Sequence, residues 1–258
     1  MLSELTANAV ADAEARRAAR PLVDVEREAL MREPALDALE ALRPGERVKI
    51  IAEIKRSSPS RGALAPIADP AALARSYELG GASAISVLTE GRRFGGSLAD
   101  LESVRAAVAL PVLRKDFIST PYQVFEARAA GADLVLLIVA ALDDATLREL
   151  FDLIVDLGMT PLVETHSVEE LDRAAALGAQ LIGVNARDLS TFELDRDLFG
   201  RLVDRFPEGA IRVAESAVQT AADVAHYRAA GADVVLVGEA LVTNDPVSTL
   251  RTFLEAGA

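Results

Sequence analysis

The stretch Gly131-Ala132-Asp133-Leu134-Val135 ends one helical pattern and opens an apolar strand. The same theme, Gly-Ala followed by a short apolar run, begins at Gly81, Gly178 and Gly231, so the four copies are 50, 47 and 53 residues apart. Glycine ends helices readily because it adopts the left-handed conformation without steric cost. A second short apolar run lies between successive copies. The repeating unit is therefore one strand and one helix of about 25 residues.

Eight such units follow one another along the chain. The expected strands are Val48–Ile54, Ala84–Leu88, Val112–Lys115, Leu134–Val139, Thr160–Glu164, Leu181–Val184, Ile211–Glu215 and Val234–Val237. Helical patterns alternate with them, for example at Asp69–Leu79, Asp143–Leu157, Ser167–Leu177 and Asp245–Glu255. Strands that are apolar throughout are typical of a parallel sheet covered by helices. We therefore predict an α/β fold, a (β/α)8 TIM barrel over residues 48–258, with a doubly wound open sheet as the alternative.

Residues 1–47 stand outside this repeat. They predict two or three charged amphipathic helices, broken near Pro21, Pro34 and Pro44. We expect this N-terminal helical extension to cover one end of the barrel, and a lid over the active site is a more specific form of the same hypothesis. The whole chain, residues 1–258, is predicted to be a single domain.

The composition excludes several classes of protein. Without cysteine there is no disulfide scaffold, thiolate metal site or thiol nucleophile. The two histidines, interpreted as a loop residue (His166) and a structural residue on a surface helix (His226), leave little for a His-based metal site. A formal charge of −13 with 4% aromatic residues argues against nucleic-acid binding. The longest apolar run, Leu134–Leu142, is far shorter than the roughly 20 residues of a membrane span, so we expect a cytoplasmic protein without membrane contact.

Polar residues gather where the predicted strands end, which is where (β/α)8 barrels place their active sites. They are Glu53, Lys55, Lys115, Glu164, Asn185, Arg187, Glu215, Ser216 and Glu239, with Gly238 at the end of the last strand. Side chains two apart on a strand share a face, so Glu164 and Glu215 point inward if Leu162 and Val213 do. Desolvation costs several kcal/mol per ion, so stabilisation of the fold explains such a set poorly. The pattern therefore predicts a catalytic site.

Two of the chain's three lysines, Lys55 and Lys115, belong to this set, whereas Lys49 does not. An ammonium group can transfer protons near neutral pH and a guanidinium cannot. Burial and the neighbouring Lys55 would lower the pKa of Lys115, while the glutamates would raise it. The sequence leaves that balance open.

Two loops favour a phosphorylated small molecule as the substrate. Ser57–Gly62 follows the first strand and Gly238–Ala240 follows the last, and small residues with glycine can present backbone N–H groups to an anion. Barrels of this type often bind phosphate after the eighth strand.

Several of these residues also have a structural interpretation. Asn185 is a common turn residue, and Arg187 could simply pair with Asp188. Phe94 and Phe117, taken alone, fit a hydrophobic core better than a ligand pocket.

The same strand ends resemble a known family. The motifs that carry the resemblance are Ile51–Ser60, Ser86–Glu90, Phe94–Ser97, Leu113–Phe117, Gly183–Leu189, Val213–Ser216 and Val237–Leu241. In their order and spacing the chain resembles the indole-3-glycerol phosphate synthases of tryptophan biosynthesis, which are (β/α)8 barrels with an N-terminal helical extension. The resemblance covers residues 48–243, and residues 1–47 match only in being helical.

The resemblance implies a reaction and a set of roles. The substrate would be 1-(2-carboxyphenylamino)-1-deoxyribulose 5-phosphate, which undergoes ring closure, decarboxylation and dehydration without a metal or organic cofactor. Lys115 would be the general acid at the ketone oxygen, Glu164 the partner in proton transfer during dehydration, and Lys55 the group that holds the substrate carboxylate and a second proton donor. The residues that orient the lysines and the substrate hydroxyls would be Glu53, Glu215, Asn185 and Arg187. The pocket for the aromatic ring would be lined by Phe94 and Phe117. The phosphate would lie near Ser58, Ser216, Ala217, Gly238 and Glu239.

One residue departs from the family pattern, which has glycine after the Glu-Ser pair where this chain has Ala217. The backbone N–H is retained, but a Cβ atom crowds an approaching phosphate and disfavours positive φ. We predict weaker phosphate binding with the chemistry retained.

Three other functions stay open from the sequence. A Schiff-base aldolase would use Lys115 as its nucleophile. Phosphoribosylanthranilate isomerase shares the fold but relies on a Cys/Asp pair, and this chain has no cysteine. A phosphosugar-binding barrel without catalytic activity is the third, and association with other enzymes of the pathway also stays open.

Overall fold

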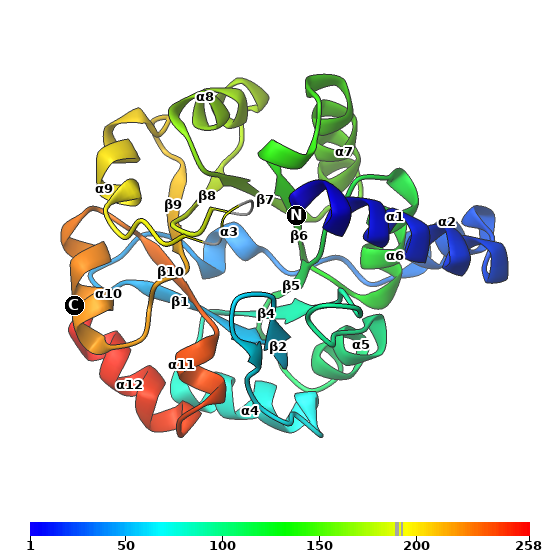
Figure 1. The fold of residues 1–258 in the computed structure, drawn as a ribbon. Helices are drawn as coiled ribbons and strands as arrows, with labels where there is room; N and C mark the ends of the chain where they lie inside the picture. The colour runs from blue at the N-terminus through cyan, green and yellow to red at the C-terminus, as the bar shows by residue number, and fades with distance from the viewer. Residues whose placement is uncertain (189–190, 192) are drawn as a thin grey trace.

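Eight parallel strands close into a barrel in the computed structural model, which describes residues 1–188, 191 and 193–258 (Figure 1). The strands are β1 (Lys49–Ile54), β4 (Ala84–Leu88), β5 (Val112–Lys115), β6 (Leu134–Ile138), β7 (Thr160–Thr165), β8 (Leu181–Asn185), β9 (Ile211–Glu215) and β10 (Val234–Val237). Strand β1 pairs with both β4 and β10, and Ile51 lies opposite Ala84 and Leu236. Because the first and last strands pair, the sheet has no free edge. The predicted (β/α)8 barrel is confirmed and the open-sheet alternative is wrong.

A ring of helices surrounds the barrel (Figure 1). It contains α4 (Pro70–Gly80), α5 (Leu98–Arg105), α6 (Pro121–Ala130), α7 (Asp144–Asp156), α8 (Val168–Leu177), α9 (Leu198–Leu202), α10 (Ala221–Ala229) and α12 (Pro246–Ala256). The four helices predicted by residue range begin and end within one residue of their predicted bounds. Their first predicted residues, Asp69, Asp143, Ser167 and Asp245, are N-caps whose side chains accept a hydrogen bond from a backbone N–H three residues on.

Short elements complete the chain between the main strands and helices. A hairpin of β2 (Ser57–Ser58) and β3 (Gly62–Ala63) follows β1, and the short helix α11 (Glu239–Val242) follows β10. The strand expected to reach Val139 ends at Ile138, because the 3₁₀ helix η1 (Val139–Ala141) begins there. A second 3₁₀ helix, η2 (Val203–Arg205), follows α9. In the described part of the chain, no helix combines the length and the apolar character that crossing a membrane requires.

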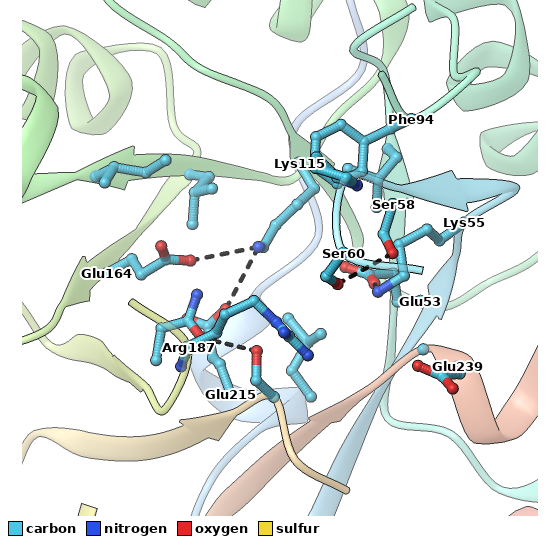
Figure 2. Close-up of a pocket in the computed structure, with 18 of the residues that line it drawn as sticks. Glu53, Lys55, Ser58, Ser60, Phe94, Lys115, Glu164, Arg187, Glu215 and Glu239 are labelled. Atoms are coloured by element: carbon cyan, nitrogen blue, oxygen red, sulfur yellow. Dashed lines mark hydrogen bonds and ion pairs between the residues drawn. The ribbon is translucent and has the colours of Figure 1, made fainter. Parts of the chain in front are cut away.

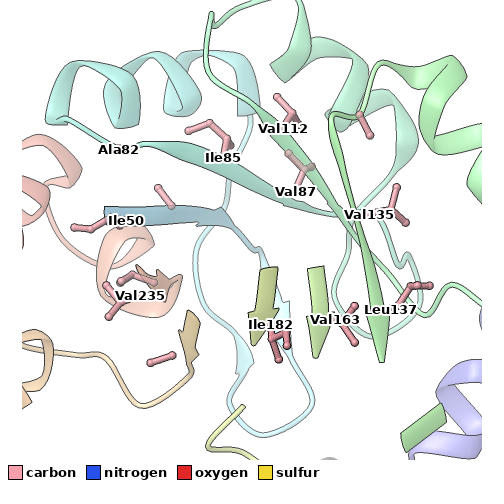
Figure 3. Close-up of a cluster of buried hydrophobic side chains, with 14 of the residues drawn as sticks. Ile50, Ala82, Ile85, Val87, Val112, Val135, Leu137, Val163, Ile182 and Val235 are labelled. Carbon is pink, nitrogen blue, oxygen red and sulfur yellow. The ribbon is translucent and has the colours of Figure 1, made fainter. Parts of the chain in front are cut away.

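Apolar side chains alternate between two layers along each strand. Ile50, Ile85, Val135 and Val163 point outward to the helices, where Figure 3 shows them in a common cluster. Their strand neighbours, including Ile51, Leu113, Leu162 and Val213, fill the barrel interior. The predicted parity of the strands is therefore confirmed, and the side chains two residues beyond these interior positions face the mouth of the barrel.

Part of the N-terminal extension lies at the end of the barrel where the strands begin. The Leu36 N–H donates a 2.7 Å hydrogen bond to the Asp133 carboxylate, immediately before β6. Helix α3 (Ala38–Ala41) and the residue after it, Leu42, contribute buried side chains to the interior cluster.

The other part lies at the opposite end, where the strands finish. Helix α1 (Leu2–Ala19) contacts the segment after β4, since the Arg92 guanidinium donates to the Asp12 carboxylate at 3.0 Å. Leu5 of α1 is buried in the interior cluster, and α2 (Leu22–Met31) packs on α6. The extension thus covers both ends of the barrel, not the one end expected. Because both parts enter the same core, we propose that residues 1–258 form one domain.

A charged contact anchors α1 to the barrel. Arg16 donates two hydrogen bonds to Glu126 of α6, from Nε to Oε1 at 2.6 Å and from Nη2 to Oε2 at 2.8 Å. Glu126 is buried and also faces the fully buried Arg114 at 3.5 Å, and Arg114 bonds to Asp116 at 3.0 Å. A buried carboxylate depends on such partners, because an unpaired one pays a large desolvation cost.

Replacement of Arg16 by methionine is expected to destabilise the fold by about 1–2 kcal/mol, because it removes two charged hydrogen bonds to a buried carboxylate. The corresponding fall in Tm is on the order of 3–6 °C for a chain of this size. Arg17 offers a matched control, since its side chain is exposed and pairs with Glu14 of the same helix; its methionine variant should melt within about 1 °C of the parent, as surface pairs contribute little. Equal Tm values for the two variants in thermal denaturation would contradict the anchoring role.

Candidate active site

A pocket opens at the end of the barrel where the strands finish, and all fourteen residues predicted for the site line it (Figure 2). They are Glu53, Lys55, Ser58, Phe94, Lys115, Phe117, Glu164, Asn185, Arg187, Glu215, Ser216, Ala217, Gly238 and Glu239. Their location is therefore as expected, while their roles stay predictions. The last residue of the motif Gly183–Leu189 lies outside the described residues.

Lys115 lies at the centre of the charged groups, at the end of β5 (Figure 2). Its Nζ atom is 3.3 Å from Oε2 of Glu164 on β7 and 3.5 Å from Oε2 of Glu215 on β9. Gly183 on β8 makes room for this group, since a Cβ atom there would lie 2.1 Å from Oε1 of Glu215. The closed barrel thus brings three distant strands to one ion cluster.

The pKa of Lys115 depends on a competition between burial and the charges of the glutamates, and the glutamates prevail. Burial alone would lower the pKa of Lys115, but the charges of Glu164, Glu215 and Glu53 outweigh it and raise that pKa above its usual value. Lys115 is therefore an ammonium ion at neutral pH when the pocket holds no substrate.

The pKa values of the two carboxyl groups next to Lys115 are shifted in opposite directions. Burial works against ionisation of Glu164, but the charges of Lys115 and His166 prevail and its pKa lies below the usual value. For Glu215, burial and the charge of Glu164 outweigh the effect of Lys115 and raise its pKa well above the usual value. Like-charged neighbours seldom both ionise in a buried site. Of the two carboxyl groups beside the Lys115 ammonium, Glu164 is therefore the one that ionises more readily.

A second lysine–glutamate pair lies on the other side of the pocket. Lys55, one residue beyond β1, places Nζ 2.6 Å from Oε1 of Glu53. Gly238 faces this pair, and a Cβ atom there would lie 2.5 Å from Glu53 Oε1 and 3.1 Å from Lys55 Nζ. Gly238 thus provides space for the pair, a reason for glycine that the sequence did not reveal.

Hydrogen bonds fix the polar groups after β8 and β9. Asn185 Oδ1 accepts from the Ser216 hydroxyl at 2.7 Å and from the Arg187 backbone N–H at 3.0 Å. Asn185 is the last residue of β8, its side chain holds the backbone two residues on, and it lines the pocket. Ser216 and Ala217 have φ values of 69° and 56°, in the left-handed region that an alanine adopts only at a cost of about 1–2 kcal/mol.

The hairpin after β1 and the start of α11 form one side of the pocket mouth. Ser58 Oγ lies 3.5 Å from Ser60 Oγ and accepts from the Arg61 N–H at 3.3 Å. The Arg61 guanidinium is 3.3 Å from the Glu239 carboxylate, so an ion pair joins the two segments.

An apolar wall faces these charged groups. The rings of Phe94 and Phe117 are 6.2 Å apart between centroids, and both line the pocket, so the interpretation of them as core residues alone was incomplete. Pro59 and Ser60 of the predicted phosphate loop Ser57–Gly62 also line the pocket, as does Asp116 of the motif Leu113–Phe117. The lining residues outside these predictions are Leu5, Leu88, Leu136, Ile138, Val218, Gln219 and Leu236. Strand parity could have found Leu136 and Ile138, whereas nothing in the sequence pattern indicates Leu5.

His166 is the titratable residue whose place in the site was missed. It lies in the loop after β7, as expected, but its Nε2 atom is 3.4 Å from Oε1 of Glu164. Its Nδ1 atom is 3.1 Å from Oε2 of Glu170 on α8. His226 lies on α10, where its Nε2 atom is 3.5 Å from Asp197. Within the described residues, no group of three or more His, Cys, Asp or Glu side chains is arranged to hold a metal ion.

Fold and site together define a (β/α)8-barrel enzyme whose pocket combines acid–base groups with an apolar wall. The family model described as Indole-3-glycerol phosphate synthase matches residues 2–253. The chain therefore belongs to the indole-3-glycerol phosphate synthase family, a family of carboxy-lyases of tryptophan biosynthesis.

Close relatives carry the same description. The indole-3-glycerol phosphate synthase of Leifsonia xyli subsp. xyli is 73% identical over 253 residues, covering 98% of this chain and 97% of the relative. That of Beutenbergia cavernae is 55% identical and covers 100% of this chain and 96% of the relative. That of Mycobacteroides abscessus is 58% identical, with 96% and 91% covered.

Solved structures with low identity share the fold alone. The 3-hexulose-6-phosphate synthase of Salmonella typhimurium has a TM-score of 0.66 at 16% identity and covers 81% of this chain and 98% of its own. The N-acetylmannosamine-6-phosphate 2-epimerase of Clostridium perfringens has a TM-score of 0.62 at 16% identity, with 82% and 93% covered.

Proposed function

We propose that this protein converts 1-(2-carboxyphenylamino)-1-deoxyribulose 5-phosphate into indole-3-glycerol phosphate, carbon dioxide and water. The observation that carries the proposal is the position of the Lys115 ammonium, between Glu164 and Glu215 and in one pocket with the apolar wall of Phe94 and Phe117. A substrate with an aryl ring at one end and a phosphate at the other needs both kinds of surface.

Ring closure requires a proton donor at the ketone. As the aromatic carbon attacks the ketone carbon, negative charge develops on the ketone oxygen, and an ammonium in a pocket of low polarity stabilises that charge and protonates it. Lys115 is charged and has a proton to give. The carboxylate then leaves as carbon dioxide, and its bonding electrons restore the ring.

Dehydration requires a base as well as an acid. The ionised Glu164, 3.3 Å from Lys115, accepts the proton from the carbon next to the nitrogen, and the hydroxyl leaves as water. Lys55 attracts the substrate carboxylate, and Glu53 orients Lys55 through their 2.6 Å contact. Glu215 orients Lys115, while Asn185 and Arg187 support the substrate hydroxyls.

The phosphate is assigned to the loops after β9 and β10. Ser216, Ala217, Gly238 and Glu239 line the pocket there and would present their backbone N–H groups to the phosphate, with Ser58 also in the lining. Together with Lys55 and Lys115, Arg187 supplies the local positive charge that an anionic substrate needs to approach a protein of formal charge −13.

Replacement of Ala217 by glycine is expected to lower KM by about three- to fivefold and to leave kcat within twofold. The reason is the φ of 56°, which strains alanine, together with the Cβ atom that crowds the phosphate. Steady-state kinetics test this, with competitive inhibition by inorganic phosphate as a second reading of the same subsite. An unchanged KM would show that Ala217 does not limit phosphate binding.

The aldolase alternative fits the pocket less well. A Schiff base forms from a neutral amine, and the surrounding carboxylates hold Lys115 as an ammonium ion. The phosphosugar-binding alternative gives no reason for two lysine–glutamate groups in one pocket. The expected cytoplasmic location and the absence of cofactors stay predictions of the sequence.

A direct assay tests the proposed function. The purified protein is incubated with the carboxyphenylamino-deoxyribulose phosphate, and indole fluorescence and released carbon dioxide are followed together. We expect both products in a one-to-one ratio. Consumption of substrate without indole, or no consumption, would refute the proposal.

A further inference from the structure

The proposed reaction takes up a proton from solvent in every turnover. The substrate carries its carboxyl group as a carboxylate, and this anion plus one proton gives the indole, carbon dioxide and water. Ring closure consumes a proton at the ketone oxygen; dehydration consumes one at the leaving hydroxyl and releases one from carbon. The net proton must reach Lys115 and Glu164 before the next turnover.

The two groups that exchange these protons are poorly accessible to water. The side chain of Glu164 is only 1% exposed, and that of Lys115 is 15% exposed toward a pocket that the substrate itself fills. A second route to solvent is therefore useful, and the structure contains a continuous line of titratable groups behind Glu164.

We propose that His166 and Glu170 form a proton relay that reloads the Lys115–Glu164 pair from solvent. The inference rests on the proposed function. Three contacts connect the groups: Lys115 Nζ to Glu164 Oε2 at 3.3 Å, Glu164 Oε1 to His166 Nε2 at 3.4 Å, and His166 Nδ1 to Glu170 Oε2 at 3.1 Å. The two oxygens of Glu164 thus face the catalytic lysine on one side and the imidazole on the other.

The geometry of His166 suits a relay. Its Nε2 atom is buried and has no hydrogen-bond partner among the described residues, so a small approach to Glu164 completes the path. Exposure rises outward, from 1% for Glu164 to 13% for His166 and 19% for Glu170. The His166 N–H also donates to Glu170 at 2.8 Å, which fixes the carboxylate at the start of α8.

The charges around His166 favour its proton-carrying form. Burial disfavours the imidazolium, but the hydrogen bond to Glu170 and the charges of Glu164, Glu170 and Asp188 outweigh burial, so the pKa of His166 lies above its usual value. These carboxylates come from β7, from α8 and from the segment after β8, and Lys115 lies behind Glu164. An imidazole can take up a proton at one ring nitrogen and pass one on from the other, so His166 can carry a proton from the solvent side to Glu164.

The relay step is balanced. His166 that is neutral with its proton on Nε2 takes up a second proton at Nδ1 from Glu170, and Glu170 takes that proton from water. The imidazolium then gives its Nε2 proton to the ionised Glu164 at Oε1, and the protonated carboxyl group turns and delivers it to the neutral Lys115 amine or to the leaving hydroxyl. The imidazole is left with its proton on Nδ1, and rotation of the ring returns a proton to the Nε2 side before the next transfer. No oxidant or further reactant is needed.

Replacement of His166 by glutamine tests the relay, because glutamine keeps a polar side chain but carries no exchangeable charge. We expect kcat to fall by about tenfold, KM to stay within twofold, and the solvent deuterium isotope effect on kcat to increase, because proton delivery becomes rate-limiting. For His166→Ala, imidazole added to the buffer should restore kcat in proportion to its concentration. His226→Gln and His226→Ala are the matched controls, since His226 lies on α10 outside the pocket lining.

Each outcome decides the question. An H166Q variant with the kcat and isotope effect of the parent overturns the relay. A lowered kcat in H166A that added imidazole does not restore also overturns it, because such a result indicates that His166 only positions Glu164. Both results leave the proposed function intact. Failure of the parent protein to form indole would overturn the proposed function and the relay with it.

Discussion

Replacement of Lys115 by methionine is expected to lower kcat by about 10³- to 10⁴-fold. Methionine fills a similar volume but removes both the proton donor and the positive charge at the ketone oxygen, and each contributes about 10²-fold or more. KM should change by less than fivefold, because Lys55 and Arg187 still attract the anionic substrate. Steady-state assays with indole fluorescence measure both constants.

Two further variants make this result specific. Lys115→Arg keeps the charge but cannot release a proton, so it should remain at least about 10²-fold impaired. Lys49, at the start of β1 and outside the pocket lining, is the matched lysine control, and K49M should retain the activity of the parent. Activity of K115M within tenfold of the parent would show that another group donates the proton. Covalent trapping of the parent by borohydride in the presence of substrate would support the aldolase instead.

Replacement of Glu164 by glutamine is expected to lower kcat by about 10²- to 10³-fold with KM within about twofold. Glutamine has nearly the same shape, so substrate binding survives, but it cannot accept the proton during dehydration. A ring-closed, decarboxylated species that still holds its hydroxyl should therefore accumulate. In rapid-quench experiments, carbon dioxide release should precede indole formation.

Glu169 provides the control for this variant. It is a glutamate of the first turn of α8, exposed to solvent and outside the pocket lining, and E169Q should show the kinetics of the parent. If E164Q instead raised KM with kcat unchanged, Glu164 would be a binding residue and the assignment of the dehydration step would be wrong. Simultaneous release of carbon dioxide and indole at a reduced rate would also contradict that assignment, because it places the slow step before decarboxylation.

The sequence predicted the barrel because its signals are local and repeated. Asp143 begins a helix through its capping side chain, and Gly131 ends one through its left-handed conformation. Both signals depend on the residue itself, so they can be recognised without tertiary information. Closure followed from the regular spacing of the units. The convergence of Lys115, Glu164 and Glu215 then required only strand parity and the rule that strand ends share one face of a barrel.

Other properties depend on distances that a sequence does not contain. The protonation of Lys115 depends on the competition between burial and carboxylates 3.3 and 3.5 Å away. The contact of His166 with Glu164 depends on how the loop after β7 turns back, and Leu5 reaches the pocket only through the packing of α1. Gly238 was assigned to phosphate binding from its position after the last strand, while its proximity to Glu53 became visible only in three dimensions.

A crystal structure with an unreactive substrate analogue, in which the ketone is reduced to an alcohol, tests the central claim most directly. We expect the new hydroxyl within hydrogen-bond distance of Lys115 Nζ, the aryl ring against Phe94 and Phe117, and the phosphate at the backbone of Ser216–Ala217 and Gly238–Glu239. A complex in which Lys115 still contacts only Glu164 and Glu215, with the hydroxyl turned away from it, would contradict the account.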